Sequence, residues 1–152
     1  MFDHVWGNEL HKGMLRHNLQ RGGAIHAYIL EGPAGSGKHT LASAYAEEMV
    51  PPEGGDGLDC AQARRKIREN LSPDVILYGL QGEKKTIGVD TVRRLREEAY
   101  LVPNELPFRM LILEHAERMT AEAQNALLKI LEEPPAGVHI LLLCENAASL
   151  LV

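Results

Sequence analysis

The chain has 152 residues, 45% of them hydrophobic and 24% charged, which is the balance of one ordinary globular domain. The formal net charge is −5, so no global positive field draws the chain to nucleic acid. The first twenty residues carry four charges and no apolar core, and no apolar run approaches the length of a membrane span. The composition predicts a cytoplasmic protein without a signal peptide or a membrane partner.

Short apolar runs alternate with helical patterns along the chain. The runs with strand character are 24–31 and three runs that we expect to be buried, 74–78, 109–113 and 138–144. The helical patterns are 38–49, 59–70, 90–101 and 121–133. We expect Asp90 and Thr120 to cap the third and fourth of these helices. Strands that alternate with helices predict an α/β fold with a parallel sheet and right-handed crossovers.

A glycine-rich loop directly follows the first predicted strand. It runs Gly32-Pro33-Ala34-Gly35-Ser36-Gly37-Lys38-His39-Thr40 and matches the phosphate-binding P-loop pattern at every position except one. The glycines let backbone N–H groups turn toward phosphate oxygens, and Lys38 reaches the terminal phosphates. His39 stands where a Ser or Thr hydroxyl normally holds Mg²⁺. The loop is therefore predicted to cradle a nucleotide and to hold its metal poorly.

The second part of a nucleotide site is expected at the end of a buried strand. There an Asp holds the metal-bound water, and a following Glu activates the attacking water. In this chain Glu114 and His115 stand in those two positions. One interpretation is a degenerate nucleotide site, and the other is a strand end capped at the surface by residues 114–117. We favour the degenerate site because a P-loop precedes it at suitable spacing.

The defects at His39 and His115 fall on the same hydrolytic step. For this reason neither Glu114 nor His115 is assigned a catalytic role. We expect weak binding of ATP or ADP, a poorly held Mg²⁺ and negligible hydrolysis.

The segment from Thr120 to Pro135, TAEAQNALLKILEEPP, is longer and more specific than the P-loop. Its apolar positions suit a core-facing helix, but a core role leaves Asn125, Lys129 and the Glu-Glu-Pro-Pro end unexplained. This segment resembles the clamp-loader branch of the AAA+ ATPases, which includes the delta-prime and gamma/tau subunits of bacterial DNA polymerase III. Further matches are His26-Ala27-Tyr28, Ser72-Pro73-Asp74, Ile87-Gly88-Val89-Asp90 and Arg93. The resemblance covers nearly the whole chain.

The resemblance implies a three-layer P-loop NTPase (AAA+) domain with a parallel sheet flanked by helices. Residues 1–152 would form the N-terminal domain of a subunit, without the lid and the C-terminal collar. In that family the strand that carries the P-loop pairs with the fourth strand, so we expect residues 24–31 to lie beside residues 138–144.

The departures from the family pattern indicate which kind of subunit this is. Motor subunits keep Thr after the P-loop lysine and an Asp-Glu pair at the third strand, so His39, Glu114 and His115 favour a non-motor, delta-prime-like subunit. Its implied role is in DNA replication, where it helps to load the sliding clamp on primed DNA, with delta and gamma/tau subunits as partners in the DNA polymerase III holoenzyme. The alternative is an ATP-hydrolysing gamma/tau-type ATPase with unusual ligands. A small-molecule kinase is a third possibility, but it gives residues 125–135 no role.

Cysteine and basic residues raise two further questions. Family members usually carry a zinc module of four cysteines between the first helix and the second strand, where this chain has only Cys60. One thiolate cannot form a tetrahedral site, so we predict no structural zinc, and we expect Cys144 to be a small core residue. The basic run Arg64-Arg65-Lys66-Arg68 could contact phosphate or a partner, but a solvated helix face is favoured because Glu69 follows it in an acidic chain.

Overall fold

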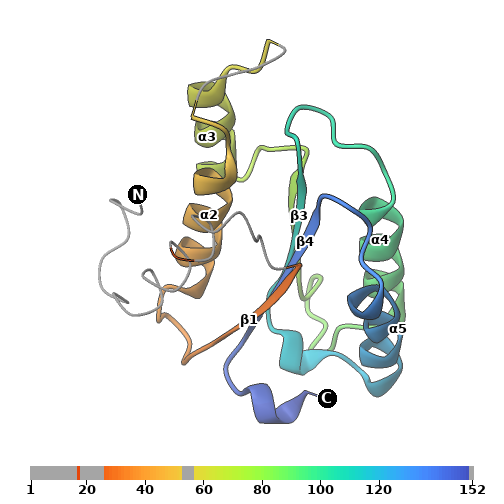
Figure 1. Cartoon of the computed structure of the whole chain (residues 1–152). Coiled ribbons are helices and arrows are strands. Elements are labelled where there is room, and N and C mark those ends of the chain that lie inside the picture. Colours follow the sequence, from red (N-terminus) through yellow and green to blue (C-terminus); the bar gives the residue numbers. More distant parts are fainter. Residues whose placement is uncertain (1–16, 18–25, 53–56, 151–152) are drawn as a thin grey trace.

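The computed structural model of the protein describes residues 17, 26–52 and 57–150. Its sheet contains β1 (Ala27–Glu31), β2 (Val75–Tyr78), β3 (Arg109–Leu113) and β4 (Val138–Cys144), in the order β1-β4-β3-β2 with all neighbours parallel. Helices α2 (Lys38–Met49) and α3 (Cys60–Arg68) cover one face, and α4 (Val89–Ala99) and α5 (Ala121–Glu132) cover the other (Figure 1). The predicted three-layer α/β fold and the pairing of the P-loop strand with β4 are confirmed.

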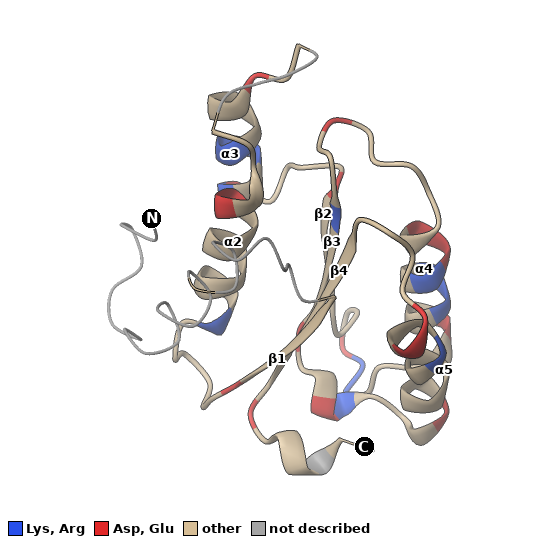
Figure 2. Ribbon diagram, viewed as in Figure 1, with Lys and Arg blue, Asp and Glu red and all other residues tan. Residues whose placement is uncertain are grey.

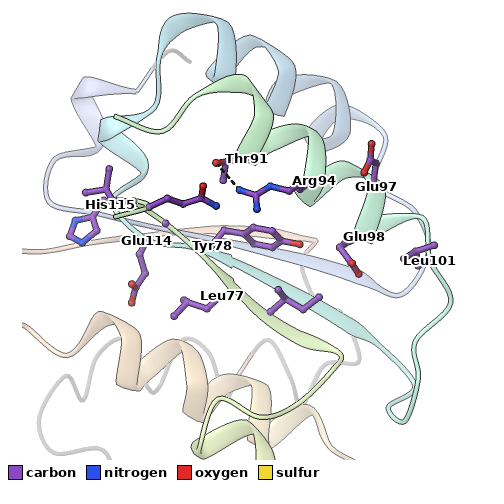
Figure 3. A pocket seen from close by; sticks show the side chains of 13 residues that line it. Leu77, Tyr78, Thr91, Arg94, Glu97, Glu98, Leu101, Glu114 and His115 are labelled. Atoms are coloured by element: carbon purple, nitrogen blue, oxygen red, sulfur yellow. Dashed lines mark hydrogen bonds between the residues drawn. The ribbon is translucent and has the colours of Figure 1, made fainter. Parts of the chain in front are cut away.

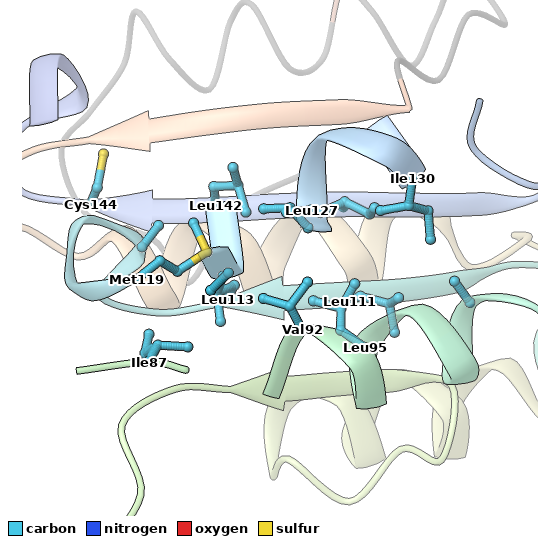
Figure 4. Close-up of a cluster of buried hydrophobic side chains, with 14 of the residues drawn as sticks. Ile87, Val92, Leu95, Leu111, Leu113, Met119, Leu127, Ile130, Leu142 and Cys144 are labelled. Atoms are coloured by element: carbon cyan, nitrogen blue, oxygen red, sulfur yellow. The ribbon is translucent and has the colours of Figure 1, made fainter. Parts of the chain in front are cut away.

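The sheet separates two hydrophobic layers. Because side chains alternate along a strand, Met110 and Ile112 of β3 pack in the layer of α2 and α3, while Leu111 and Leu113 pack in the layer of α4 and α5. Every residue of β3 and β4 is buried. The second layer also contains Val92, Leu95, Leu127, Ile130 and Leu142 (Figure 4). The core faces of α4 and α5 therefore meet at the two central strands.

The two outer strands of the described sheet are partly exposed, and for β2 this differs from the prediction that residues 74–78 are buried. β2 has β3 as its neighbour and lies at an edge, so Leu77 is 39% exposed rather than buried. β1 lies at the opposite edge, where Ile29 is 52% exposed. Of the predicted first strand, residues 24 and 25 lie outside the described residues. An apolar run alone does not separate an edge strand from a central one.

Three helix starts can be compared with the sequence predictions. The start of α3 at Asp59 and the cap of α5 at Thr120 agree with them, whereas the cap of α4 differs. The side chains of Asp59 and Thr120 accept the N–H groups of residues 62 and 123 at 3.0 and 3.1 Å, and so cap α3 and α5. The prediction that Asp90 caps α4 is wrong, because Gly88 precedes the helix and Asp90 lies in its first turn, 3.4 Å from Arg93 Nη1. An acidic residue suits the first turn as well as the cap, because both face the positive end of the helix dipole.

A buried ionic cluster fastens the loop between α4 and β3 to the end of the sheet. The fully buried carboxylate of Asp74 accepts three backbone N–H groups at 2.6 to 2.8 Å, from Asn104, Glu105 and Leu106. Arg109 lies 3.5 Å from Asp74 and donates to Glu98 at 2.7 Å and to the carbonyl of Val102 at 2.9 Å. The two central charges therefore neutralise each other and satisfy the loop backbone.

Basic residues lie along α3 (Figure 2), and their side chains contact partners within the chain. Arg64 donates to the carbonyl oxygens of Val50 and Pro51, and Arg68 contacts the buried Glu47 at 2.7 Å. The remaining pairs are Lys66 with Glu105 and Arg65 with Glu69, at 2.6 and 3.8 Å. These contacts favour the interpretation of α3 as a helix face with its own counter-charges over that of a phosphate-binding patch.

Among the described residues, no helix has the length and apolar character needed to cross a membrane.

Candidate nucleotide site

The glycine-rich loop lies between the carboxyl end of β1 and the first turn of α2. Gly35 and Gly37 have φ of 75° and 87°, a left-handed conformation in which glycine is unstrained. A Cβ at Gly32 would lie 2.8 Å from the Ser36 hydroxyl oxygen, so a side chain there would displace that hydroxyl. The N–H of Gly32 donates to the carbonyl of Cys144 at 3.0 Å and so anchors the loop on β4. This is the strand–loop–helix context in which N–H groups and the helix dipole favour phosphate.

Lys38 begins α2 and folds back over the loop. Its Nζ donates to the carbonyl oxygens of Gly32 and Pro33, at 2.5 and 2.9 Å. The ammonium group therefore lies against the loop whose phosphate ligand it would contact.

A cavity of about 390 Å³ brings the loop and the end of β3 together. Its wall consists of residues 34–40, Glu114, His115, Glu117, Leu143, Cys144 and Glu145. Gly32 and Pro33 lie instead on a neighbouring hollow beside β1. Glu117 was not predicted as part of the site, and no pattern in the sequence places it there. It reaches the cavity through a short 3-10 turn over Ala116–Arg118.

The two residues that replace the metal ligands contact each other. His39 Nδ1 and Glu114 Oε1 are 3.6 Å apart, and their side chains are 39% and 30% exposed. In a competent P-loop site a hydroxyl and an aspartate present oxygen atoms to Mg²⁺ here. This pair offers one imidazole nitrogen and one carboxylate.

His115, in the water-activating position, is exposed and has a left-handed backbone with φ 54° and ψ 44°. Left-handed conformations are uncommon for residues other than glycine, and His is among those that adopt them more often. The turn that follows is closed by the N–H of Arg118, which donates to the His115 carbonyl at 2.8 Å.

The charge of the cavity opposes a polyphosphate. Glu114, Glu117 and Glu145 contribute three carboxylates, whereas Lys38 is the one Lys or Arg among the described residues of the wall. A polyphosphate adds several negative charges, and like charges at this range repel. A bound cation would reduce this repulsion, in addition to the attraction from Lys38 and the loop N–H groups.

Cys144 ends β4 and is 1% exposed, which agrees with the predicted core position. Burial raises the pKa of its thiol, and the negative charges of Glu117 and Glu31 raise this pKa further, whereas the positive charge of Lys38 lowers it.

Among the described residues, no group of three or more His, Cys, Asp or Glu side chains is arranged to hold a metal. The absence of structural zinc stays a prediction.

We expect Cys144 to react with iodoacetamide markedly more slowly than Cys60, which is partly exposed. The reactive species is the thiolate, and both burial and a raised pKa reduce its accessible population at pH 8. Alkylation rates of the single-cysteine variants Cys60→Ser and Cys144→Ser, followed by mass spectrometry, would measure the difference. In urea the two rates should converge, and fast alkylation of Cys144 in the folded protein would contradict the prediction.

A larger hollow of about 880 Å³ lies beside β2 and α4 (Figure 3). It shares Glu114 and His115 with the nucleotide cavity, and Leu77, Tyr78 and Leu101 form part of its wall. Burial, with a smaller contribution from Glu98, raises the pKa of Tyr78 to about 12. The phenol therefore stays neutral at physiological pH.

Comparisons with known proteins agree with this architecture. The family model described as "DNA polymerase III, delta subunit" matches residues 7–152. DNA polymerase III subunit delta' of Yersinia pestis is 32% identical over 149 residues, which cover 96% of this chain and 43% of that protein. Subunit delta' of Pseudomonas aeruginosa is 35% identical over 129 residues, which cover 83% of this chain and 39% of that protein. Subunit gamma/tau of Mycobacterium tuberculosis is 32% identical over 136 residues, which cover 88% of this chain and 23% of that protein.

A solved structure shows the same fold. The gamma subunit-related protein of Thermotoga maritima aligns with a TM-score of 0.60 and 23% identity, over 90% of this chain and 41% of its own. The chain spans about two fifths of the length of the delta' relatives it matches. Because the family model accounts for residues 7–152, the protein belongs to the DNA polymerase III delta-subunit family.

Proposed function

We propose that the protein acts in DNA replication as a non-motor, delta-prime-like subunit of the DNA polymerase III clamp loader. In this role it helps to load the sliding clamp on primed DNA, and its direct partners are delta and gamma/tau subunits. Clamp and DNA are reached through the complex. Family membership supports the proposal. Two delta' relatives support it as well: one is 32% identical over 96% of this chain, and the other is 35% identical over 83% of it.

The contact between His39 and Glu114 carries the non-motor part of the proposal. These side chains lie 3.6 Å apart at the point where a hydroxyl and an aspartate would hold Mg²⁺. The exposed imidazole of His115 replaces the carboxylate that activates water. The site keeps a phosphate cradle and lacks the usual groups for hydrolysis.

We expect the protein to bind ATP or ADP weakly in the presence of Mg²⁺ and to hydrolyse ATP at a negligible rate. Loss of a positioned general base alone costs on the order of 10²-fold in rate. Calorimetric titration would measure the affinity, and steady-state phosphate release, alone and with partner subunits and primed DNA, would measure turnover. A gamma/tau-type subunit of the same host serves as the positive control. Turnover at the level of that control, abolished by Lys38→Ala, would contradict the non-motor proposal.

A gamma/tau-type ATPase is the second candidate function. It is favoured by the complete Gly32, Gly37 and Lys38 framework, with its left-handed glycine before α2, and by gamma/tau relatives at 32% identity. The same turnover assay separates the two candidates, because only the motor subunit hydrolyses ATP when the complex is complete.

Assembly is tested independently of nucleotide chemistry. The complete gene product, tagged and purified from its own host, should retain delta, gamma/tau and the sliding clamp, identified by mass spectrometry. Failure to retain any of them, in a preparation whose circular dichroism shows a folded protein, would refute the proposed place in the clamp loader.

A further inference from the structure

The metal position of the nucleotide cavity does not fit Mg²⁺. Magnesium requires near-octahedral coordination by oxygen at about 2.0–2.1 Å and releases its water reluctantly. The side chain at the hydroxyl position is His39, and its nitrogen Nδ1 lies 3.6 Å from Glu114 Oε1. Imidazole nitrogen suits zinc, cobalt and related transition metals, whereas oxygen donors alone suit magnesium.

The distance between the two donors fits a metal of the transition series. Ligand nitrogen and oxygen atoms lie about 2.0–2.2 Å from Zn²⁺, and tetrahedral geometry then places two donors roughly 3.4 Å apart. His39 Nδ1 and Glu114 Oε1 are 3.6 Å apart. A shift of a few tenths of an ångström, within the freedom of two part-exposed side chains, is enough to bring both donors onto one ion.

We propose that this cavity binds a nucleoside di- or triphosphate together with a borderline divalent metal of the Zn²⁺ and Co²⁺ class. The metal is held by His39 Nδ1 and the Glu114 carboxylate, and phosphate oxygens and water complete its coordination. The inference rests on the proposed nucleotide binding of the same site and names the metal that this site selects.

The charges and the ligand count make metal and nucleotide depend on each other. The described residues provide no group of three or more potential ligands, so the protein alone holds the metal weakly. Conversely, the carboxylates of Glu114, Glu117 and Glu145 repel a polyphosphate, and a bound cation reduces this repulsion. Each ligand therefore raises the affinity for the other by the same factor. A two-ligand site of this kind exchanges its metal and differs from the structural zinc site that Cys60 cannot form.

The contact between His39 and Glu114 is too weak to close the site by itself. At 3.6 Å the two atoms are beyond hydrogen-bond distance, and both side chains are about a third exposed. Ion pairs at such positions contribute little to stability. Both donors are therefore available to an incoming metal.

Titration of fluorescent mant-ADP into the protein with Co²⁺, with Mg²⁺ or with a chelator tests the inference. Loss of a partner that merely orients a metal ligand already costs about 10- to 100-fold in affinity. We expect mant-ADP to bind at least about tenfold more tightly with Co²⁺ than with Mg²⁺. The visible absorption of Co²⁺ should show the bands of a nitrogen-ligated, low-coordinate ion only when unlabelled ADP is present.

Two variants locate the effect. His39→Thr restores the hydroxyl, and it should abolish the Co²⁺ bands and the preference for Co²⁺ over Mg²⁺. His26→Gln removes an exposed histidine just before β1, at the opposite end of that strand from the loop, and should change neither. Circular dichroism confirms that each variant is folded.

Three results would overturn the inference. The first is equal mant-ADP affinity with Co²⁺, with Mg²⁺ and with chelator, the second is the absence of binding in every condition, and the third is Co²⁺ bands that persist in folded His39→Thr. None of them alters the recovery of clamp-loader subunits in the affinity purification. Failure of this inference is therefore distinguishable from failure of the proposed function.

Discussion

Replacement of Asp74 by Ala is expected to lower the free energy of unfolding by about 3–5 kcal/mol, the usual cost of breaking a buried ion pair by removing one partner. The substitution removes the acceptor of three backbone N–H groups in the loop 104–106. It also leaves Arg109, 2% exposed, without the carboxylate 3.5 Å away. Arg109 keeps its contacts with Glu98 and the carbonyl of Val102, so much of the loss comes from the three backbone N–H groups that are left without an acceptor.

Urea denaturation followed by circular dichroism would measure this loss. The matched control is Asp90→Ala, because Asp90 also pairs with an arginine but has a side chain that is 91% exposed, so its loss should leave the midpoint nearly unchanged. Asp74→Asn keeps one acceptor oxygen and should fall between the control and Asp74→Ala. Equal midpoints for Asp74→Ala and Asp90→Ala would show that the buried cluster does not stabilise the fold.

Truncation of Leu111 to Ala is expected to cost about 2–5 kcal/mol of the free energy of unfolding. Leu111 is fully buried in the central strand β3, in the layer of α4 and α5. Removal of three carbons there loses their transfer free energy and leaves a cavity that β3 and its neighbours, held by the sheet hydrogen bonds, can only partly fill.

Leu77→Ala is the control, since the same truncation on the edge strand β2 affects a side chain that is 39% exposed. We expect its effect on the urea midpoint to be clearly smaller, because less apolar surface is returned to water. A larger loss for Leu77→Ala than for Leu111→Ala would contradict the burial of these two positions in the structure.

Local patterns were sufficient to predict most of the fold. The helix over 38–49 is found with the predicted bounds because the loop ending at Gly37 fixes its start. β3 and β4 were predictable because strands covered on both faces are continuously apolar. Burial of 74–78 was overestimated, since the position of a strand within a sheet depends on pairing partners far away in the sequence.

The site was predictable to the extent that motifs fix position. P-loop spacing identified Lys38 and His39, and the end of the third strand identified Glu114 and His115. Their approach within one cavity follows from the parallel sheet, in which strand ends meet at one edge. Glu117 depends on the turn after His115, and the pairing of Asp74 with Arg109 joins residues 35 positions apart. The hydrophobic periodicity of the sequence predicts neither the position of Glu117 nor the pairing of Asp74 with Arg109.

The backbone at His115 limits which residues suit this position at the end of β3. At φ 54° and ψ 44° an ordinary L-residue pays roughly 1–2 kcal/mol, because its Cβ crowds the following carbonyl. His115 already bears part of this strain, and His adopts the left-handed region more readily than Glu does. A glutamate in its place would therefore add a smaller cost, or it would rotate the backbone and displace the turn that carries Glu117 into the cavity.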